Sequence, residues 1–311
     1  MMRIFIAGAS GAVGQPLARQ LAEAGHEVHG MTRTPAKAAR LRELGAELVV
    51  ADALDRDAVM AAVTEARPDV VVHQMTAIAE MNTRNLDAAF VPTNRLRREG
   101  TDNLVAAARA AGARRFVAQS FAPWSYKREG GPVKAEDAPL ETDPPKHVEE
   151  TVAAIRHLEG AVTGAQGLEG IVLRYGGFYG PGTGIARGGD MLEMIAKGRF
   201  PVVGDGGGVW SLIHIEDAAA ATVAAIERGR PGIYNVADDE PAPVREWLPA
   251  LAEAIGGRRP RHMPGFLGRL LLGQAGYAMM TSLRGVSNAK AKRELGWTPA
   301  YPSWRQGFAA L

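Results

Sequence analysis

The stretch "IFIAGASGAVGQPLARQLAEAGH" at residues 4–26 decides the fold. A short apolar run, which predicts a strand, leads into a glycine-rich loop and then into an amphipathic helical pattern that stops at Gly25. We expect Gly8 to make a tight turn, Gly11 to let the backbone approach a pyrophosphate, and Gly14 to allow close packing of helix on strand. Directly after a first strand, this pattern predicts a dinucleotide-binding loop at a helix N-terminus; a merely structural glycine turn is the alternative.

The first half of the chain alternates between strand and helix patterns. Runs rich in β-formers occupy residues 3–8, 26–32, 46–52, 69–75, 114–120 and 170–176, with helical patterns between most of them. This alternation predicts an α/β fold with a parallel sheet covered by helices on both faces. After residue 176 glycine-rich loops take over, which we interpret as a smaller lobe over the carboxyl ends of the strands. The expected domains are 1–176 and 177–311, with segment 210–240 returning to the first.

The end of the predicted second strand indicates which dinucleotide is bound. Sites that prefer NAD usually place an acid there, about 20 residues after the glycine loop, to bind the ribose hydroxyls. Here the segment is "GMTRTPAKAAR" at residues 30–40, which has no carboxylate. Thr32 and Arg33 can instead bind a 2′-phosphate through hydrogen bonding and charge. We therefore predict NADP(H) in preference to NAD(H), although Arg33 as a solvated loop residue is the alternative.

Composition excludes several classes of function. The 311 residues include no cysteine, which excludes disulfides, thiolate zinc sites and cysteine nucleophiles, and which fits a cytoplasmic protein. The charges are interleaved and sum to a formal +2, so no nucleic-acid partner is expected. The seven histidines are scattered, with His26 and His29 three apart in a predicted strand, so no metal site is expected. We predict a small-molecule substrate.

The most apolar segment is "GFLGRLLLGQAGYAMM" at residues 265–280. It falls short of the roughly 20 apolar residues that span a bilayer and is interrupted by Arg269 and Gln274. We predict an amphipathic helix that is buried in the second lobe or at a homodimer contact, and no attachment to a membrane.

Seven stretches of the chain are similar to motifs of one enzyme family. They are "GASGAVG" (8–14), "VVADALD" (49–55), "NRLRREGTDNLVAAARAAGARRFV" (94–117), "LRYGGFYGPG" (173–182), "WSLIHIEDAAAATVAAIE" (210–227), "YNVADDEP" (234–241) and "LGWTPAY" (295–301). Through them the chain resembles, over nearly its whole length, the extended and atypical short-chain dehydrogenase/reductases of the epimerase/dehydratase-like branch. The resemblance implies a Rossmann-type doubly wound parallel sheet with a smaller C-terminal substrate lobe.

The same resemblance implies where the cofactor is bound. Asp52 and Ala53 are expected to contact adenine, with the alternative that Asp52 caps the helix that follows. The loop 74–76 is expected beside the ribose and nicotinamide, Asn94 is expected to support the active site, and segment 174–179 is expected to close over the nicotinamide end. The predicted cofactor-binding residues are Gly8, Ser10, Gly11, Ala12, Val13, Gly14, Thr32, Arg33, Asp52, Ala53, Gln74, Met75, Thr76, Asn94, Tyr175 and Gly176.

The catalytic motif of the family is not repeated in this chain. The family places paired serines after the fifth strand, the second usually catalytic, and then a tyrosine and a lysine four residues apart on a helix. The dipeptide "SF" (120–121) aligns with the serines. One register puts Lys146 and Glu150 at the tyrosine and lysine positions, and another register puts Thr151 and Ile155 there. Neither restores the pair, so we expect a modified active site.

We predict Ser120, Tyr126 and Lys146 as the catalytic residues. Tyr126 resembles the tyrosine of the family's "VYG" segment, which usually binds substrate, and its phenol is a candidate proton donor near the expected nicotinamide. The other nearby candidates are His147, Tyr175 and Tyr179. Aromatic side chains in and beside glycine-rich loops favour a shaped substrate cleft. The predicted substrate-binding residues are Phe121, Trp124, Tyr179 and Trp210.

These observations leave three functional hypotheses. The first is an NADP(H)-dependent oxidoreductase that acts on a carbonyl or alcohol of a small molecule, such as a secondary metabolite or sugar, with a non-standard proton donor. The second is a lyase, isomerase or cyclase without net redox chemistry, which the missing tyrosine and lysine favour. The third is a non-catalytic NADP(H) sensor. The fold and the cofactor loop favour the oxidoreductase.

Overall fold

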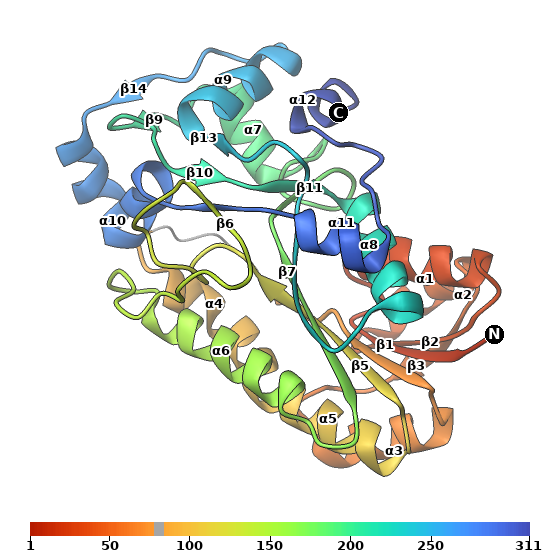
Figure 1. The fold of residues 1–311 in the computed structure, drawn as a ribbon. Helices are drawn as coiled ribbons and strands as arrows, with labels where there is room; N and C mark the ends of the chain where they lie inside the picture. Colours follow the sequence, from red (N-terminus) through yellow and green to blue (C-terminus); the bar gives the residue numbers. More distant parts are fainter. Residues whose placement is uncertain (78–83) are drawn as a thin grey trace.

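A computed structural model describes residues 1–77 and 84–311, apart from the side chains of residues 37–39. In that part of the chain the main sheet has seven strands, in the order β12-β7-β5-β4-β1-β2-β3 (Figure 1). All its pairings are parallel. The strands are β1 (Arg3–Ala7), β2 (Glu27–Thr32), β3 (Ala46–Val50), β4 (Val70–His73), β5 (Arg115–Phe121), β7 (Glu169–Tyr175) and β12 (Gly232–Val236). The order reverses between β1 and β4, where open α/β sheets bind ligands. The predicted Rossmann-type sheet is confirmed.

Side chains that alternate along the strands build two apolar cores. Along β1, Ile4 and Ile6 face one core while Phe5 and Ala7 face the other, and all four are fully buried. The first core is covered by α1 (Gly14–Glu23), α8 (Ile215–Arg228) and α11 (Ala289–Leu295), and the second by α3 (Arg56–Ala66), α5 (Thr101–Ala110) and α6 (Glu149–Thr163) (Figure 1). Burial on both faces explains the continuous apolar runs of the strands.

The remaining elements of the sheet domain are short. A 3₁₀ turn (η1, Pro35–Lys37) and α2 (Ala38–Glu43) connect β2 to β3, while α4 (Leu86–Arg95) continues through a one-turn π-helix (η2, Leu96–Gly100) into α5. Strand β12 and helix α8 come from the second half of the sequence but pack with the main sheet.

The second lobe lies at the top of Figure 1, around its own apolar core, which includes the fully buried Trp247 and Trp304. Its helices are α7 (Asp190–Ala196), α9 (Val244–Ala254), α10 (Gly265–Thr281) and α12 (Trp304–Ala309). Short strand pairs lie in the lobe and beside the sheet domain: β8 (Gly177–Tyr179) with β11 (Leu212–His214), β9 (Val202–Val203) with β14 (His262–Met263), β10 (Val209–Trp210) with β13 (Ala242–Pro243), and β6 (Val133–Lys134) with β15 (Gly285–Val286).

Helix α10 differs from the single amphipathic helix expected for its segment. Gly273 has a φ of 69° and breaks the helix into two halves. The second half buries Ala275, Ala278 and Met280 in the lobe core. The first half instead exposes four large apolar side chains, Phe266, Leu267, Leu270 and Leu271. The expectation of burial within the lobe is therefore wrong for this half, and contact with a second copy stays a prediction. Among the described residues, no helix is both long and apolar enough to cross a membrane.

Candidate active site

The first loop forms a backbone cradle that only glycine permits at two positions. Gly8 has a φ of 91°, a conformation that L side chains rarely adopt. A Cβ at Gly14, the first residue of α1, would lie 2.2 Å from the carbonyl oxygen of Gly8. The amide of Gly11 donates to the same carbonyl at 3.0 Å. The loop is thus folded tightly onto the N-terminus of α1, the geometry that binds a pyrophosphate.

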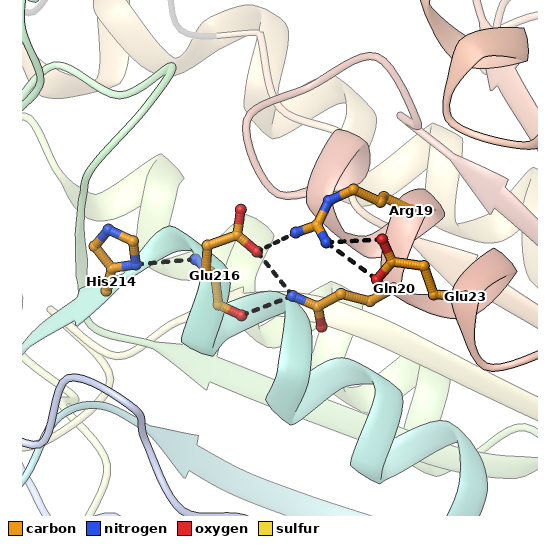
Figure 2. Close-up of polar contacts among 5 residues, drawn as sticks. All are labelled: Arg19, Gln20, Glu23, His214 and Glu216. Atoms are coloured by element: carbon orange, nitrogen blue, oxygen red, sulfur yellow. Dashed lines mark hydrogen bonds and ion pairs between the residues drawn. The ribbon is translucent and has the colours of Figure 1, made fainter.

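Helix α1 is fixed against α8 by a polar cluster (Figure 2). One Glu216 carboxylate oxygen on α8 accepts hydrogen bonds from Arg19 at 2.6 Å and from Gln20 at 2.9 Å. The other guanidinium nitrogen of Arg19 binds Glu23 at 3.1 Å, and the amide of Glu216 donates to Nδ1 of His214 at 3.3 Å. These bonds help to hold the phosphate-facing helix in register with the rest of the domain.

The adenosine side of the site carries the predicted polar residues. The hydroxyls of Ser10 and Thr32 lie 3.0 Å apart, and the amide of Thr34 donates to Thr32 at 3.2 Å. Arg33 is exposed and makes no hydrogen bond or ion pair with any described residue. The guanidinium is therefore available to an anionic ligand beside the glycine loop.

Asp52 does not cap the helix that follows it. Its carboxylate accepts a hydrogen bond from the amide of Leu54 at 3.0 Å, whereas Asp55 caps α3 by accepting from the amides of residues 57 and 58. The carbonyl of Ala53 accepts from Asn103 at 3.0 Å. The two residues that were expected to contact adenine thus lie in a tight turn at the carboxyl end of β3.

The carboxyl ends of β4 and β7 meet beside the glycine loop. A Cβ on Gly8 would lie 2.8 Å from the backbone of Gln74, which places the two segments in contact. Gln74 donates to the hydroxyl of Tyr175 at 3.5 Å, and its buried Oε1 has no partner among the described residues. Tyr175 also bonds Thr222 at 2.6 Å, and its burial raises the pKa of the phenol to about 12. Met75 is buried, Thr76 is exposed, and the amide of Gly176 donates to Val236 at 3.0 Å.

The second register of the catalytic motif lies in a buried polar network. The Thr151 hydroxyl donates to Asp87 at 2.8 Å and accepts from Asn94 at 3.1 Å. The other end of the Asn94 amide accepts from Arg97 at 3.3 Å. Ile155, one turn further along α6, is buried and apolar. In this register the tyrosine position therefore holds the Thr151 hydroxyl, which donates its proton to the Asp87 carboxylate, and the lysine position holds no lysine.

Arg97 is a buried cation that sequence reasoning missed. It is 5% exposed, stands on the π-helix η2, and makes no hydrogen bond to a described residue apart from the one to Asn94. Burial lowers the pKa of its guanidinium to about 10, so the group stays charged at neutral pH. No local sequence pattern marks Arg97, because its burial depends on segments distant in the sequence. The π-turn that carries it is of a kind common at functional sites.

Ser120 and Tyr126 belong to a second buried network. Ser120 donates to Glu159 at 2.6 Å, and the same carboxylate is paired with Arg174 at 2.5 Å. The Tyr126 hydroxyl donates to Asn235 at 2.8 Å and accepts from Arg174 at 2.7 Å. Burial raises the pKa of the Tyr126 phenol. Both hydroxyls are thus held within the protein, and their catalytic role stays a prediction.

The other candidates for proton transfer are spread over the structure. Lys146 and His147 are exposed on the loop before α6, and the cation beside Tyr126 is Arg174, not Lys146. Tyr179 is fully buried against His214 and Phe308, and its hydroxyl has no partner among the described residues. Burial, then the nearby Asp238, raises the pKa of the Tyr179 phenol.

An apolar cavity opens where β5 and β8 leave the sheet domain. Of the predicted substrate-binding residues, Phe121 and Trp210 line this cavity, while Trp124 and Tyr179 lie in the lobe core. Its other walls are Ala122, Pro123, Gly177, Ser211, Met279, Leu283, Arg284 and Val286.

One group of possible metal ligands lies at another part of the sheet. Glu27, His29 and Glu47 gather on β2 and β3, with His29 nitrogens 3.0 and 3.5 Å from the two carboxylates. Because these contacts are those of an ordinary ion-pair cluster, no chemistry follows from them, and the expectation of no metal stays a prediction.

Comparisons with known proteins identify the family. Residues 4–237 match the NAD dependent epimerase/dehydratase family, and the chain belongs to it. It is 46% identical to a 3-diazoavenalumate denitrifying reductase of a Streptomyces species, over 99% of both chains. It is 30% identical to the 2-alkyl-3-oxoalkanoate reductase of Stenotrophomonas maltophilia, over 83% of this chain and 77% of that one. Among solved structures, the Thermus thermophilus UDP-glucose 4-epimerase complex with NAD is 26% identical with a TM-score of 0.73, covering 99% and 97% of the chains. The reductase relatives support a small-molecule oxidoreductase on this fold.

Proposed function

We propose that the chain binds NADP(H) at the glycine loop and uses it in a reduction. The close packing at Gly8 and Gly14 folds the loop onto the N-terminus of α1, a geometry that suits a pyrophosphate, and Arg33, which has no partner among the described residues, suits a 2′-phosphate. The related epimerase was solved in complex with NAD, which supports the binding of a nicotinamide nucleotide by this chain. When bound, this cofactor supplies a hydride.

We further propose that the substrate is a small aromatic diazo compound, which is reduced with loss of dinitrogen. The support is the relative at 46% identity that is named as a denitrifying reductase of a diazo compound. Phe121 and Trp210 on the cavity wall suit the face of an aromatic ring.

This proposal rests on one observation, which is that the hydroxyl of Thr151 donates its proton to Asp87. Reduction of a carbonyl needs a proton on the substrate oxygen. In the register that puts Thr151 and Ile155 at the family's tyrosine and lysine positions, the Thr151 hydroxyl donates to Asp87 and Ile155 has no titratable group. An arenediazonium ion needs no such proton. It accepts the hydride with its electron pair, the carbon–nitrogen bond breaks, and an arene and N₂ are left beside oxidised cofactor.

The test is a single-turnover reaction of the purified protein with NADPH and an ortho-hydroxyarenediazonium salt. We expect one N₂ and one reduced arene for each NADPH oxidised, with the N₂ measured by mass spectrometry from substrate labelled with nitrogen-15. NADPH oxidation without N₂, or no reaction above that of free NADPH, would contradict the proposal.

Carbonyl reduction is the second candidate, because the relative at 30% identity is named as a reductase of a 3-oxo acid. It requires a non-standard proton donor in place of the missing tyrosine and lysine, for which Ser120, Tyr126 and Lys146 are the proposed residues. A β-keto acid in the same assay distinguishes the two, since its reduction consumes NADPH and yields an alcohol without release of N₂.

A further inference from the structure

Arg284 lies at the wall of an apolar cavity and has no partner among the described residues. It directly precedes β15, and among the described residues that line the cavity it is the only charged one. Its Nε is buried and makes no hydrogen bond to any described residue. A buried N–H without an acceptor costs about 1–3 kcal/mol, so the group is set up for an acceptor that the chain does not supply.

The polar groups on either side of Arg284 are already used. The Ser211 hydroxyl accepts from the amide of Val286 at 2.8 Å and lies 3.3 Å from the carbonyl of the same residue. The indole nitrogen of Trp210 donates to the carbonyl of Met279 at 2.8 Å. These bonds hold the walls of the cavity in place. The Arg284 guanidinium is left as the group that can bind a negatively charged part of a ligand.

The backbone around Arg284 is held on both sides. The carbonyl of Leu283 accepts from Val209, and the amide of Gly285 donates to the carbonyl of Pro132, each at 2.9 Å. A Cβ on Gly285 would lie 2.8 Å from Pro241. A fixed backbone limits how far the guanidinium moves away from the cavity, which favours a binding role.

The cavity continues toward the expected nicotinamide end. Phe121 is the last residue of β5, and Gly177 follows the carboxyl end of β7. A ligand that fills the cavity therefore extends from the carboxyl ends of two central strands to Arg284 in the lobe. Its body faces Phe121, Trp210, Met279 and Leu283, and one end faces a cation.

We propose that this cavity binds an aromatic or conjugated carboxylate, with the acid group on Arg284 and the ring between Phe121 and Trp210. The proposal deepens the proposed diazo reduction and rests on it only for the reacting group. A guanidinium binds a planar carboxylate through two parallel hydrogen bonds, and the apolar walls bind the flat body. The substrate's acid group is then held at the far end from the hydride donor.

The first experiment measures binding without turnover. Isothermal titration of the NADP⁺ complex with 4-hydroxycinnamate and with its methyl ester compares wild type, Arg284→Gln and Arg269→Gln. Arg269 is an exposed arginine on α10 outside the cavity lining and serves as the matched control. We expect Arg284→Gln to weaken binding of the acid about 10- to 100-fold and of the ester less than about threefold, because only the acid loses charge-assisted bonds.

The second experiment measures kcat/KM for a diazo-substituted acid and its ester with the same variants and with Arg284→Lys. Arg284→Lys keeps the charge and should restore part of the preference for the acid. Equal affinity of wild type for acid and ester, or an equal loss of both in a variant with an unchanged circular dichroism melt, would overturn the proposal. If the acid binds as expected but releases no N₂, the proposed function fails while the carboxylate site stands.

Discussion

At the scale of single residues, two of the hydroxyls predicted for catalysis, those of Ser120 and Tyr126, are bound by other side chains. Tyr126 is 3% exposed, donates its proton to Asn235 and accepts from Arg174. Its partners are 109 and 48 residues away along the chain, so only tertiary packing reveals them. A phenol held in this way with a raised pKa stabilises the site that surrounds it.

We predict that Tyr126→Phe lowers stability more than it lowers turnover. The variant leaves one N–H of Arg174 and the side-chain oxygen of Asn235 without the Tyr126 hydroxyl, which should reduce the free energy of unfolding by about 1–3 kcal/mol. Turnover per folded molecule should stay within about tenfold, below the roughly 10²- to 10⁴-fold loss typical of a missing general acid. Urea unfolding and steady-state kinetics measure the two effects. A loss of turnover above about 10²-fold in a folded variant would restore Tyr126 as the proton donor.

The preference for NADP(H) is a second prediction about one side chain. Arg33→Ala should weaken NADPH by about 1.5–3 kcal/mol through loss of a charge-assisted contact to the 2′-phosphate, and should change NADH little. Arg42→Ala, an exposed arginine on α2, is the control. Titration calorimetry with both nucleotides measures the difference. Equal weakening of the two nucleotides, or tighter NADH in the wild type, would contradict the prediction.

The sequence could propose cofactor residues where they are local. Gly8, Ser10 and Thr32 follow from the order of strand, loop and helix, and the structure brings the hydroxyls of Ser10 and Thr32 together at 3.0 Å. Arg97 and Arg284 could not be found in this way. Arg97 is buried and Arg284 has a buried Nε, each beside few or no described hydrogen-bond acceptors, and both features depend on segments distant in the sequence.

At the scale of elements, the hydrophobic periodicity of the sequence predicts where strands and helices lie better than it predicts breaks within them. The expected strand at 114–120 is observed as Arg115–Phe121, and the one at 170–176 as Glu169–Tyr175. The break of α10 was not expected, because a glycine within an apolar helical pattern does not reveal a φ of 69°. A Cβ at Gly273 would lie 3.0 Å from the carbonyl oxygen of Arg84. The segment that precedes α4 therefore packs closely against the break in α10.

The loop between β1 and α1 gives a prediction for an element. Gly11→Val should place a branched side chain where the pyrophosphate approaches and raise the Kd for NADPH more than about 10²-fold. The added Cβ would meet one protein atom at 3.2 Å, so the fold should survive. Gly131→Val, in an exposed loop with nothing within 4 Å of the added Cβ, is the matched control. Unchanged NADPH binding by a folded Gly11→Val protein would mean that the loop is only a turn.

At the scale of the whole molecule, two buried groups give stability opposite dependences on pH. Burial raises the pKa of Asp238 to about 8, so the folded state keeps a proton that the unfolded state loses above its ordinary pKa of 3.8. Burial lowers the pKa of His73 to about 4, so the unfolded state binds a proton below about pH 6.5 that the folded state does not. As pH rises, Asp238 therefore lowers stability between about pH 4 and 8, and His73 raises it between about pH 4 and 6.5.

Above about pH 6.5 the contribution of Asp238 is no longer opposed by His73, which gives the last prediction. The free energy of unfolding should fall by about 2 kcal/mol between about pH 6.5 and 8, since each unit of pH changes it by about 1.4 kcal/mol per proton. Asp238→Asn keeps the shape of the neutral acid and can still accept from the amide of Glu240, but it cannot ionise. Asp238→Asn should therefore remove the fall in the free energy of unfolding, whereas Asp137→Asn, at an exposed carboxylate, should leave that fall unchanged. Urea unfolding at three pH values in this window measures the slopes, and a wild-type slope that Asp238→Asn does not flatten would show that Asp238 is already ionised in the folded protein.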